Sequence, residues 1–522
     1  MKPARPPRAR RRRARLGLAC AIGWAGLSLP PPSIRPCHAA DRAGPMPAES
    51  PAESDARPAG VFVPGAADRA FVDDLEHRTF TWFWDAADPQ NGLIPDHYPS
   101  PDRFASIAAV GFGLTAYGIG AERGYVTRAQ AVARTLATLR FFAAAPQNAT
   151  EDGAAGYRGL YYHFLDPRRG VRFARWSELS SVDTTLLLGG VLFAQSYYDR
   201  DTPPERAIRR LADRLYRRVD WAWMRRRAPL LAMGWTPSGR FLRNDWDGYN
   251  EGMLIYLLAL ASPTHPVPGG TWQAWTGTYA RQWGRFQGQT LLNFAPLFGH
   301  QYSESWIDFR GIRDGWSRDH DLDYFENSRR ATYAQRAYAQ ANPGGWRDYG
   351  PDIWGLTACN GPGIATRTVD GRSRSFLAYS ARGAGRDYVS DDGTIAPTAA
   401  GGSIAFAPEI ALPALEAMKA RYGARVYDRY GFVDAFNPSF AGAAPHGASP
   451  GSASFWADTE QFGIDQGPIL LMIENWRSGL VWATMKKNPY IRAGLIRAGF
   501  TGGWLDGLQR QARGDVSAHG HG

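Results

Sequence analysis

The segment Leu297–Asn342, LFGHQYSESWIDFRGIRDGWSRDHDLDYFENSRRATYAQRAYAQAN, predicts two helices, over 298–308 and 324–341, joined by a polar loop. Outward from this segment the same helical periodicity continues in both directions, and few runs show the period-two alternation of strands. The other predicted helices cover 69–86, 105–122, 127–144, 179–198, 203–224, 248–261, 270–284, 407–422, 464–485 and 487–499.

The number and pairing of these helices predict an all-α protein. Two apolar-faced helices per unit, repeated about six times, are typical of an (α/α)6 toroid, in which inner helices surround a central axis and outer helices shield them. The loops grow longer in the second half of the chain, so we expect them to form a cleft on one rim. An open α-solenoid would also fit the helix count, but no fixed sequence period supports one.

The first 40 residues have the features of a signal peptide. They contain nine basic residues and no acidic one, so they supply +9 of the formal net charge of +11 and leave +2 for the rest of the chain. An apolar run, Leu16–Leu29, follows the basic one, and the small-x-small pattern ending at Ala40 suits cleavage. We therefore expect a periplasmic or secreted protein. The alternatives are an uncleaved anchor, a lipoprotein modified at Cys20 and export by the twin-arginine route.

A basic N-terminus can also be a nucleic-acid-binding arm, but the apolar run that follows disfavours this, and we expect no nucleic-acid partner. Residues 41–66 are rich in Ala, Pro, Asp, Glu and Ser and predict a flexible linker, and residues 507–522 predict a disordered tail. This leaves one predicted domain, 67–506. Once the leader is removed only Cys359 remains, so no internal disulfide is expected, and no later apolar run is long enough to span a membrane. We expect a monomer.

Aromatic and polar side chains are closely interspersed in the opening segment. A packed core does not need so many polar groups, and a solvated helix face does not need so many aromatic rings. A sugar needs both, because its C–H faces stack on rings and its hydroxyls bond to planar polar groups. The pattern therefore favours a carbohydrate-binding surface, with a large aromatic helical core as the alternative. The rings are Phe298, Tyr302, Trp306, Phe309, Trp316, Tyr324 and Phe325.

Carboxylates recur at the predicted helix starts, and cleavage of a glycosidic bond needs two of them. Acidic residues are also favoured there because they complement the helix dipole. Glu251 and Asp465 each precede a long apolar run, so each should either pair with a cation or line a cavity. Arginines such as Arg310 and Arg330 could form such pairs. The other candidates are Glu178, Asp183, Glu326 and Glu409 near helix starts, with Asp391 and Asp392 in a loop.

Other chemistries lack their motifs. The chain has no HExxH, no paired CxxC, no DxDxDG calcium loop, no phosphate-binding glycine loop and no GxSxG elbow. We therefore expect no cofactor and no metal. A cation held by the aspartate-rich loops without a motif is an alternative.

Seven segments carry a family resemblance, from Gly248 to Phe500. They are YNEGMLIYLLALASPTHPVP, PLFGHQYSESWIDFRGIRD, DYFENSRRATYAQRAYAQANP, WGLTACNGPG, DDGTIAPTAAGGSIAFAPEIALPAL, YGFVDAFNPSF and IDQGPILLMIENWRSG. In sequence and order they resemble the glucoamylase-like domain family, which includes bacterial endo-β-1,2-glucanases and sophorose-releasing exo-acting enzymes. The family is also related to the transglycosylase domain of cyclic β-1,2-glucan synthases. Residues 68–247 resemble it mainly through SVDTTLLLGG.

The resemblance implies an (α/α)6 barrel that hydrolyses β-1,2-glucan or a related β-glucan with inversion. Inversion requires carboxyls about 6.5–9.5 Å apart, unless the proton passes through water or a substrate hydroxyl. By motif position Glu251 is the expected general acid, and Asp183 and Asp465 are candidates for the base or for positioning water. Glu178 is a further candidate. The residues expected to line sugar subsites are His300, Tyr302, Trp306, Asp308, Glu326, Arg329, Trp354 and Asp392.

The chain departs from the family pattern at Cys359-Asn360, where relatives often carry Ser-Asp, and this puts the chemistry of one subsite in doubt. Two alternatives to a hydrolase stay open. One is a β-glucan transglycosylase on the same scaffold, and the other is a glycan-binding protein without catalysis.

Overall fold

The computed structural model describes residues 62–99, 104–441 and 455–507. The predicted leader 1–40 lies outside the described residues, as do most of the predicted linker 41–66 and nearly all of the predicted tail 507–522. The first helix begins at Ala66.

The described chain is rich in helices, and most of the predicted ones are present. The longer ones are α1 (Ala66–Ala86), α2 (Ile107–Glu122), α3 (Arg128–Ala144), α4 (Ser181–Tyr197), α5 (Pro203–Arg217), α7 (Met253–Ala261), α9 (Phe298–Trp306), α11 (Tyr324–Ala341), α13 (Pro408–Tyr422), α14 (Gly463–Arg477), α15 (Leu480–Lys487) and α16 (Pro489–Ala498). Short helices are α6 (Trp221–Met224), α8 (Thr271–Thr276), α10 (Gly315–Asp319) and α12 (Pro397–Gly401).

Three predicted helices differ from the structure. The predicted helix 464–485 is two helices, because Gly479 takes a left-handed conformation, φ +70°, between α14 and α15. The predicted helix 203–224 breaks after Arg217. The predicted helix 270–284 ends at Thr276, and the chain then enters a hairpin of β9 (Trp283–Phe286) and β10 (Gln289–Leu292).

Small sheets also occur, so a description as purely helical is incomplete. Most of them have two strands, and one has five in the order β3-β4-β6-β7-β8. These five strands are β3 (Gly156–Tyr157), β4 (Leu160–Tyr162), β6 (Leu179–Ser180), β7 (Gly234–Thr236) and β8 (Arg240–Phe241).

Helices α2, α4, α7 and α14 are apolar on nearly every side and are almost wholly buried, whereas α5 has one charged face. Helices α2 and α4 approach closely because glycines meet at their contact. A Cβ on Gly111 would lie 2.1 Å from the Leu186 carbonyl oxygen, and one on Gly190 would lie 2.0 Å from the Gly111 carbonyl oxygen. Any larger residue would force these two helices apart.

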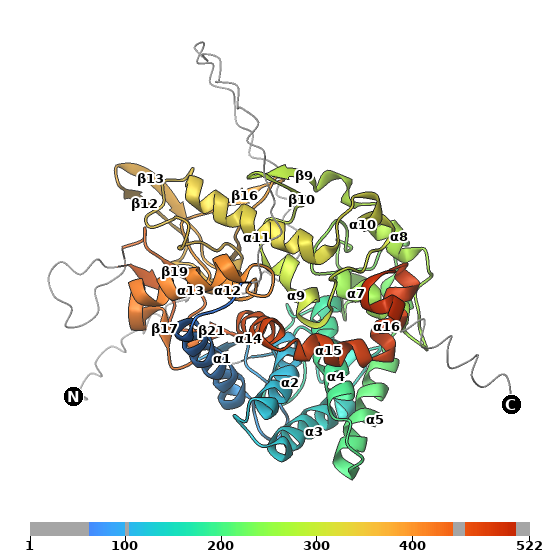
Figure 1. Cartoon of the computed structure of the whole chain (residues 1–522). Helices are drawn as coiled ribbons and strands as arrows, with labels where there is room; N and C mark the ends of the chain where they lie inside the picture. Colours follow the sequence, from blue (N-terminus) through green and yellow to red (C-terminus); the bar gives the residue numbers. More distant parts are fainter. Residues whose placement is uncertain (1–61, 100–103, 442–454, 508–522) are drawn as a thin grey trace, which may run out of the picture.

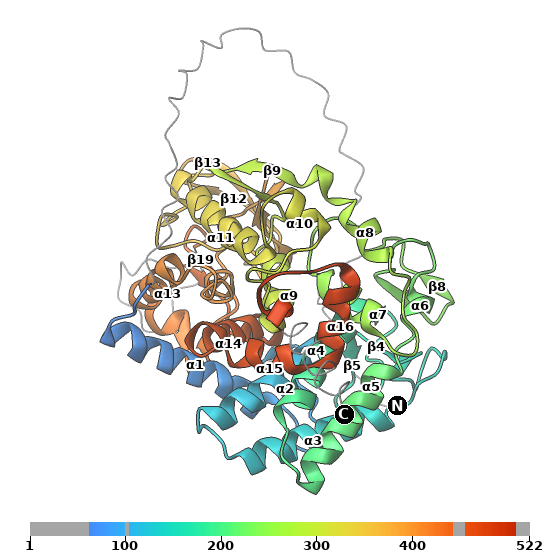
Figure 2. The ribbon, with the colours of Figure 1, turned by 45° about the vertical axis from the view of Figure 1, so that its right-hand side comes forward.

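The elements follow one another around the molecule in chain order (Figure 1), and α14 returns to pack against α1 and α2. Helix α9 lies between the outer α11 and the pair α14 and α15 in both views (Figures 1 and 2). Side chains join neighbouring inner helices. The Gln301 amide of α9 donates to the Ala399 carbonyl of α12 at 3.0 Å, and Ser303 Oγ accepts from the Leu254 N–H of α7 at 3.2 Å.

Short strands hold the starts of several buried helices together at one end of the molecule, which we call the strand rim. Strand β2 (Ala105–Ser106) leads into α2 and pairs with β5 (Phe164–Leu165). Strand β6 leads into α4 and pairs with β4, while β21 (Gln461–Phe462) leads into α14 and pairs with β1 (His97–Tyr98). Side chains in the first turns of α4 and α14 are therefore held at the same end of the molecule.

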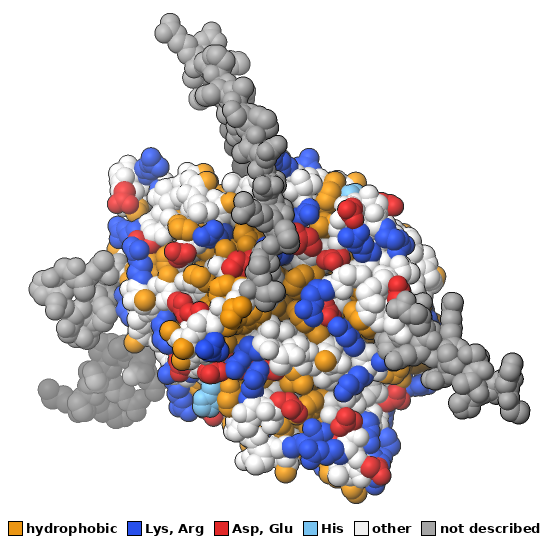
Figure 3. All heavy atoms as spheres, in the orientation of Figure 1, with side chains coloured by type: hydrophobic (Ala, Val, Ile, Leu, Met, Phe, Trp, Pro, Cys, Tyr) orange, Lys and Arg blue, Asp and Glu red, His pale blue; other side chains and the backbone are white. Residues whose placement is uncertain are grey.

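The folded surface carries mixed charge. On the face drawn in Figure 3, basic and acidic side chains are intermixed, with hydrophobic side chains exposed near the middle. Within 62–99, 104–441 and 455–507 no helix combines the length and apolar character that crossing a bilayer requires.

Candidate active site

Three of the predicted catalytic carboxylates converge around one tyrosine. Asp183 and Asp465 lie in the first turns of α4 and α14, and Glu251 lies just before α7. Tyr302 comes from α9, and burial together with the charges of Asp465, Glu251 and Asp183 raises the pKa of its phenol. Residues far apart in the chain therefore share one electrostatic environment. The strand pairs β4–β6 and β1–β21, which hold the starts of α4 and α14, explain why Asp183 and Asp465 lie in it.

Glu251 has the properties of a proton donor. Its side chain is buried, and its Oε2 has no hydrogen-bond partner among the described residues. Burial, with a further contribution from the charge of Asp183, raises the pKa of Glu251 to about 8. The group therefore keeps its proton at neutral pH, as a general acid must.

Asp183 is held in a hydrogen-bonded clamp. Its Oδ1 lies 3.4 Å from His163 Nε2, and Ser180 donates a hydrogen bond to its other oxygen. The second ring nitrogen of His163 lies 3.0 Å from Glu178 Oε1. Burial lowers the pKa of His163, but the two carboxylates outweigh it and raise that pKa to about 9. An imidazolium thus stands between Glu178 and Asp183 and supports the charge of both.

The same three side chains are the one group in the described chain whose ligand atoms could surround a metal ion, since these atoms lie within 4.8 Å of one another. The imidazole, however, presents a different nitrogen to each carboxylate. An ion bound by one nitrogen would have to break this arrangement. The geometry suits a carboxylate–imidazolium–carboxylate clamp better than a metal site.

Asp465 faces a second carboxylate that the sequence analysis did not single out, Asp434. Both are buried, and burial raises the pKa of each. Asn360 donates its backbone N–H to Asp434 Oδ2 at 2.7 Å and its side-chain amide to Asp458 Oδ2 at 2.8 Å. The departure from the family pattern at Asn360 thus places a side-chain donor against Asp458, where an ionised aspartate would repel that carboxylate. Asp434 lies inside the segment YGFVDAFNPSF, which carried the family resemblance.

Exposed aromatic rings stand beside these carboxylates. Tyr388 is 46% exposed and lies within electrostatic reach of Glu251. Tyr379 is 37% exposed and lies within reach of Asp465 and Asp434. Both lie in irregular segments, where helical periodicity offers no signal. Both rings are exposed enough for a sugar to stack on them.

The structure places the predicted aromatic subsite residues Trp306 and Trp354 in the interior, where both indoles are fully buried. Trp306 stacks on Phe112 with ring centroids 4.7 Å apart and donates its N–H to Thr115 Oγ1 at 3.0 Å. His300 is buried as well. Its Nε2 lies 3.2 Å from the Phe294 carbonyl, and burial lowers its pKa to about 3, so it is a neutral packing residue. Of the predicted rings, Tyr302 alone meets the carboxylates.

Three predicted polar subsite residues are held in ion pairs. Asp308 follows the C-terminal end of α9, lies 2.7 Å from Arg310 Nε and also pairs with Lys486. Glu326 and Arg329 lie on the outer helix α11. They pair with Arg330 and Glu409 at 3.1 Å and 3.3 Å, respectively.

Asp392 is likewise a structural residue. Arg382, which is fully buried, donates to both of its oxygens at 2.7 Å and 2.8 Å and also donates to the Cys359 carbonyl at 2.7 Å. This pair supports β11 (Ala358–Cys359), the strand that directly precedes Asn360. Because its carboxylate is fully used, Asp392 cannot bind sugar hydroxyls as predicted.

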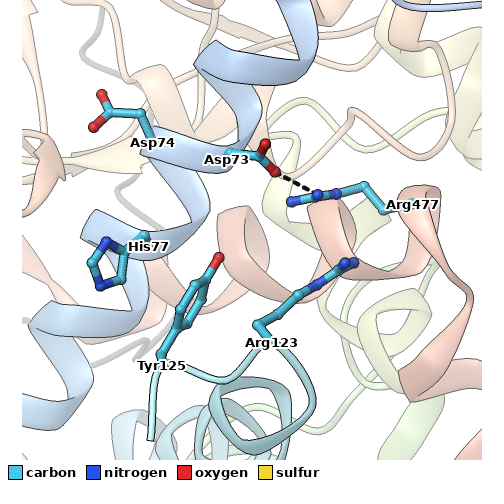
Figure 4. Close-up of a pocket in the computed structure, with 6 residues that line it drawn as sticks. All are labelled: Asp73, Asp74, His77, Arg123, Tyr125 and Arg477. Atoms are coloured by element: carbon cyan, nitrogen blue, oxygen red, sulfur yellow. Dashed lines mark ion pairs between the residues drawn. The ribbon is translucent and has the colours of Figure 1, made fainter.

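A pocket opens elsewhere, between α1, the turn after α2 and the end of α14 (Figure 4). Its guanidinium groups are already paired: Arg477 with Asp73 and the buried Glu76, and Arg123 with the buried Glu474. Arg477 ends α14, about 18 Å along the helix axis from Asp465. This network joins three helices at the end opposite to the carboxylates. The remaining lining residues are Asp74, His77 and Tyr125.

Comparisons with known proteins place this geometry among related structures. The family model described as "Putative glucoamylase" matches residues 243–489, which include Glu251 and Asp465. A solved structure from Bacteroides uniformis, described as a putative glucoamylase, is 32% identical, with a TM-score of 0.72, and the match covers 85% of this chain and 100% of that one.

Two further relatives have more specific descriptions. An endo-β-1,2-glucanase from Chitinophaga pinensis, solved with sophorotriose and glucose, is 28% identical, with a TM-score of 0.71 and coverage of 84% of this chain and 99% of that one. An exo β-1,2-glucooligosaccharide sophorohydrolase from Parabacteroides distasonis is 27% identical over 82% of this chain. The match spans only 57% of the length of that curated relative.

Proposed function

The chain belongs to the glucoamylase-like family, and on this basis we propose that it is a glycoside hydrolase that cleaves β-1,2-glucan or a related β-glucan. One observation carries the proposal: the buried carboxyls of Asp183, Glu251 and Asp465 meet around Tyr302, beside the exposed ring of Tyr388. Its relatives from Chitinophaga and Parabacteroides, described as acting on β-1,2-linked glucans, favour this linkage over that of starch.

The proposed scaffold is an (α/α)6 barrel. The buried helices α2, α4, α7, α9, α12 and α14 form the inner ring, and the surrounding helices cover them. The contacts of α14 with α2, α9 and α12 support closure of this ring, as do the hydrogen bonds that join α9 to α7 and α12. In such a ring the inner helix starts face one cleft.

The proposed reaction is a single displacement with inversion. Glu251 gives its proton to the glycosidic oxygen as the bond from that oxygen to the anomeric carbon breaks. A water molecule attacks the same carbon from the opposite face and loses a proton to the Asp465 carboxylate. Asp183, whose ionised form the imidazolium of His163 favours against burial, stabilises the positive charge that develops on the sugar ring and helps Glu251 to retain its proton. Both carboxyls return to their starting states by exchange with solvent.

We also propose that the protein is exported and acts as a monomer on glucan outside the cytoplasm. The support for export is the basic and apolar composition of residues 1–40.

The test is a substrate screen. Purified protein is incubated with linear β-1,2-glucan, β-1,3-glucan, cellulose oligomers and starch, and new reducing ends are counted. We expect β-1,2-glucan to be cut fastest, with one ¹⁸O from labelled water at each new reducing end. Products without ¹⁸O would identify a transglycosylase instead, and binding without any cleavage would identify a glycan-binding protein.

A further inference from the structure

Two arginine side chains of an exposed hairpin converge on one glycine. The hairpin consists of β12 (Ala365–Val369) and β13 (Arg372–Phe376), which pair antiparallel at the edge of the molecule (Figures 1 and 2). A Cβ placed on Gly345, in the loop after α11, would lie 3.3 Å from Arg372 Nη1 and 3.5 Å from Arg374 Nη2. Glycine at this position therefore keeps the space between the two guanidinium groups free of a side chain.

The positive charges of this hairpin have no carboxylate partner among the described residues. Arg374 donates from Nη2 to the Gly345 carbonyl at 3.1 Å, and Arg372 is exposed. A third arginine, Arg367, stands directly opposite Arg374 in the strand pair and donates to the Ala441 carbonyl at 3.1 Å. Like charges opposite each other destabilise a strand pair. An anion bound between these side chains would remove that cost.

The acidic residue of the hairpin does not balance these charges. Asp370, in the turn between β12 and β13, lies 3.8 Å from Arg347 Nη2. The segment 442–454, which follows Ala441, has no acidic residue in its sequence. The hairpin and Arg347 together carry four arginines against one aspartate. This excess of positive charge favours an anionic ligand.

Aromatic rings hold two of the guanidinium groups in place. Arg374 Cζ lies 4.1 Å from the centroid of the Trp346 ring. Arg367 Cζ lies 3.8 Å from the centroid of the Phe440 ring. The two rings are buried in one cluster with Phe376, so they form a fixed base under the hairpin. A guanidinium stacked on a ring keeps its N–H groups at its edge, where a phosphate or a carboxylate can accept two of them at once.

Both ends of the hairpin lead into the candidate active site. Asn360, whose N–H donates to Asp434, lies five residues before the start of β12. Tyr379 lies three residues after the end of β13, and its exposed ring lies 6.1 Å from that of Phe462, just before α14. Arg374 precedes Tyr379 by five residues, so at most about 18 Å of extended chain separates them. A group attached to a glucan that is bound at Tyr379 can therefore reach the arginines.

We propose that Arg372 and Arg374, supported by Arg367, bind an anionic group, a phosphate or a carboxylate, that is carried by the glucan. The substrate class is then a β-glucan with acidic substituents. This inference rests on the proposed hydrolase function, which places the glucan at the strand rim. Phosphate and carboxylate share the chemistry that the site recognises, which is a set of negatively charged oxygens that accept paired N–H donors.

The first test needs no glucan. Thermal unfolding is followed at increasing concentrations of inorganic phosphate, and sodium chloride at equal ionic strength gives the baseline. We expect phosphate to raise the Tm of the wild type above this baseline, because a ligand that binds only the folded state stabilises it. The rise should be smaller in R372Q and absent in R372Q/R374Q.

The variant R372Q should fold normally, because Arg372 is exposed and forms no hydrogen bond or ion pair with the described residues. The matched control is R210Q, which removes an exposed arginine from the charged face of α5. Its Tm should respond to phosphate like that of the wild type. Equal responses of the wild type and R372Q would overturn the anion site.

The second test identifies what carries the anion, and it measures binding, so it does not depend on cleavage. Calorimetry at low salt gives the Kd of E251Q for neutral β-1,2-glucan oligosaccharides and for the same oligosaccharides bearing carboxymethyl groups. We expect the carboxymethylated ones to bind about 3- to 10-fold more tightly, in keeping with a charge-assisted contact at a partly exposed site. The preference should disappear in E251Q/R372Q and persist in E251Q/R210Q.

The two tests separate the possible outcomes. A phosphate response without a preference for carboxymethylated oligosaccharides would show that the site binds a free anion, and it would overturn the assignment to the glucan. A wild type that cleaves no glucan, together with a preference that R372Q abolishes, would contradict only the hydrolase and would leave the anion site in place.

Discussion

His163 Nε2 lies 3.4 Å from Asp183 Oδ1, and the same ring places its other nitrogen 3.0 Å from Glu178. This relationship opposes the effect of burial on Asp183: burial raises the pKa of its carboxyl, and the imidazolium of His163 counteracts part of that rise. Glu251 is buried without such a partner, and its pKa is raised to about 8.

The first prediction concerns the proton donor. Replacing Glu251 by Gln keeps the size of the side chain but removes the proton it can transfer. We expect kcat to fall by about 10²–10⁴-fold with little change in KM, because general acid catalysis contributes that much to the rate. The control is E409Q, whose carboxylate is held by Arg329 on the outer helices and should matter little for turnover. An E251Q protein as active as E409Q would exclude Glu251 as the acid.

The second prediction is the pH profile of the wild type. Asp465 must be ionised to accept a proton, and its pKa is raised by burial to about 7. Glu251 must be protonated to donate one, and its pKa is raised to about 8. We therefore expect kcat/KM to rise as the pH passes about 7 and to fall as it passes about 8. Initial rates over a broad pH range test this, and a plateau at acidic pH would contradict it.

The third prediction concerns the clamp. In H163Q the cation beside Asp183 is lost, and we expect kcat to fall by about 10- to 100-fold, in keeping with the loss of one electrostatic stabiliser. Folding also raises the pKa of His163 from 6.5 to about 9. Its contribution to stability is therefore fully present below pH 6.5 and is lost as the pH rises through about 9.

Thermal unfolding at several pH values tests the direction of this pH dependence. The difference in Tm between the wild type and H163Q should be largest at mildly acidic pH and should shrink in alkaline buffer. The control H265Q changes an exposed loop histidine and should show no such trend. A Tm difference that does not vary with pH would mean that His163 is uncharged.

The fourth prediction tests the exposed ring beside Glu251. Removing the Tyr388 ring in Y388A should raise KM for oligosaccharides by about 3- to 10-fold, the range expected for one lost stacking contact, while Y388F should stay near the wild type. Val389, the next residue, is 50% exposed and provides the control V389A. Equal KM values for Y388A and V389A would show that this ring does not contact the sugar.

Local sequence was sufficient for most helices. The helices 105–122 and 179–198 are apolar on all sides, and they are the buried α2 and α4. The hairpin of β9 and β10 was missed, because strand pairing depends on a partner segment that periodicity does not describe. The break at Gly479 carried a local signal, since glycine readily takes the left-handed conformation found there.

For the site, the sequence alone was enough to identify carboxylates that begin buried helices, because both the dipole preference and the apolar run that follows are local properties of the chain. It could not distinguish Trp306, which is sealed in the core, from Tyr388, which faces solvent, since burial depends on what packs against a side chain. The neighbour of Asp465 was hidden for the same reason: 30 residues of chain separate it from Asp434, and only the folded structure brings the two buried carboxyls into one electrostatic environment. The sequence thus determined that carboxyl groups would carry the chemistry. The tertiary structure decided which of them is the acid and which the base, because the pKa of each depends on its burial and on the charges beside it.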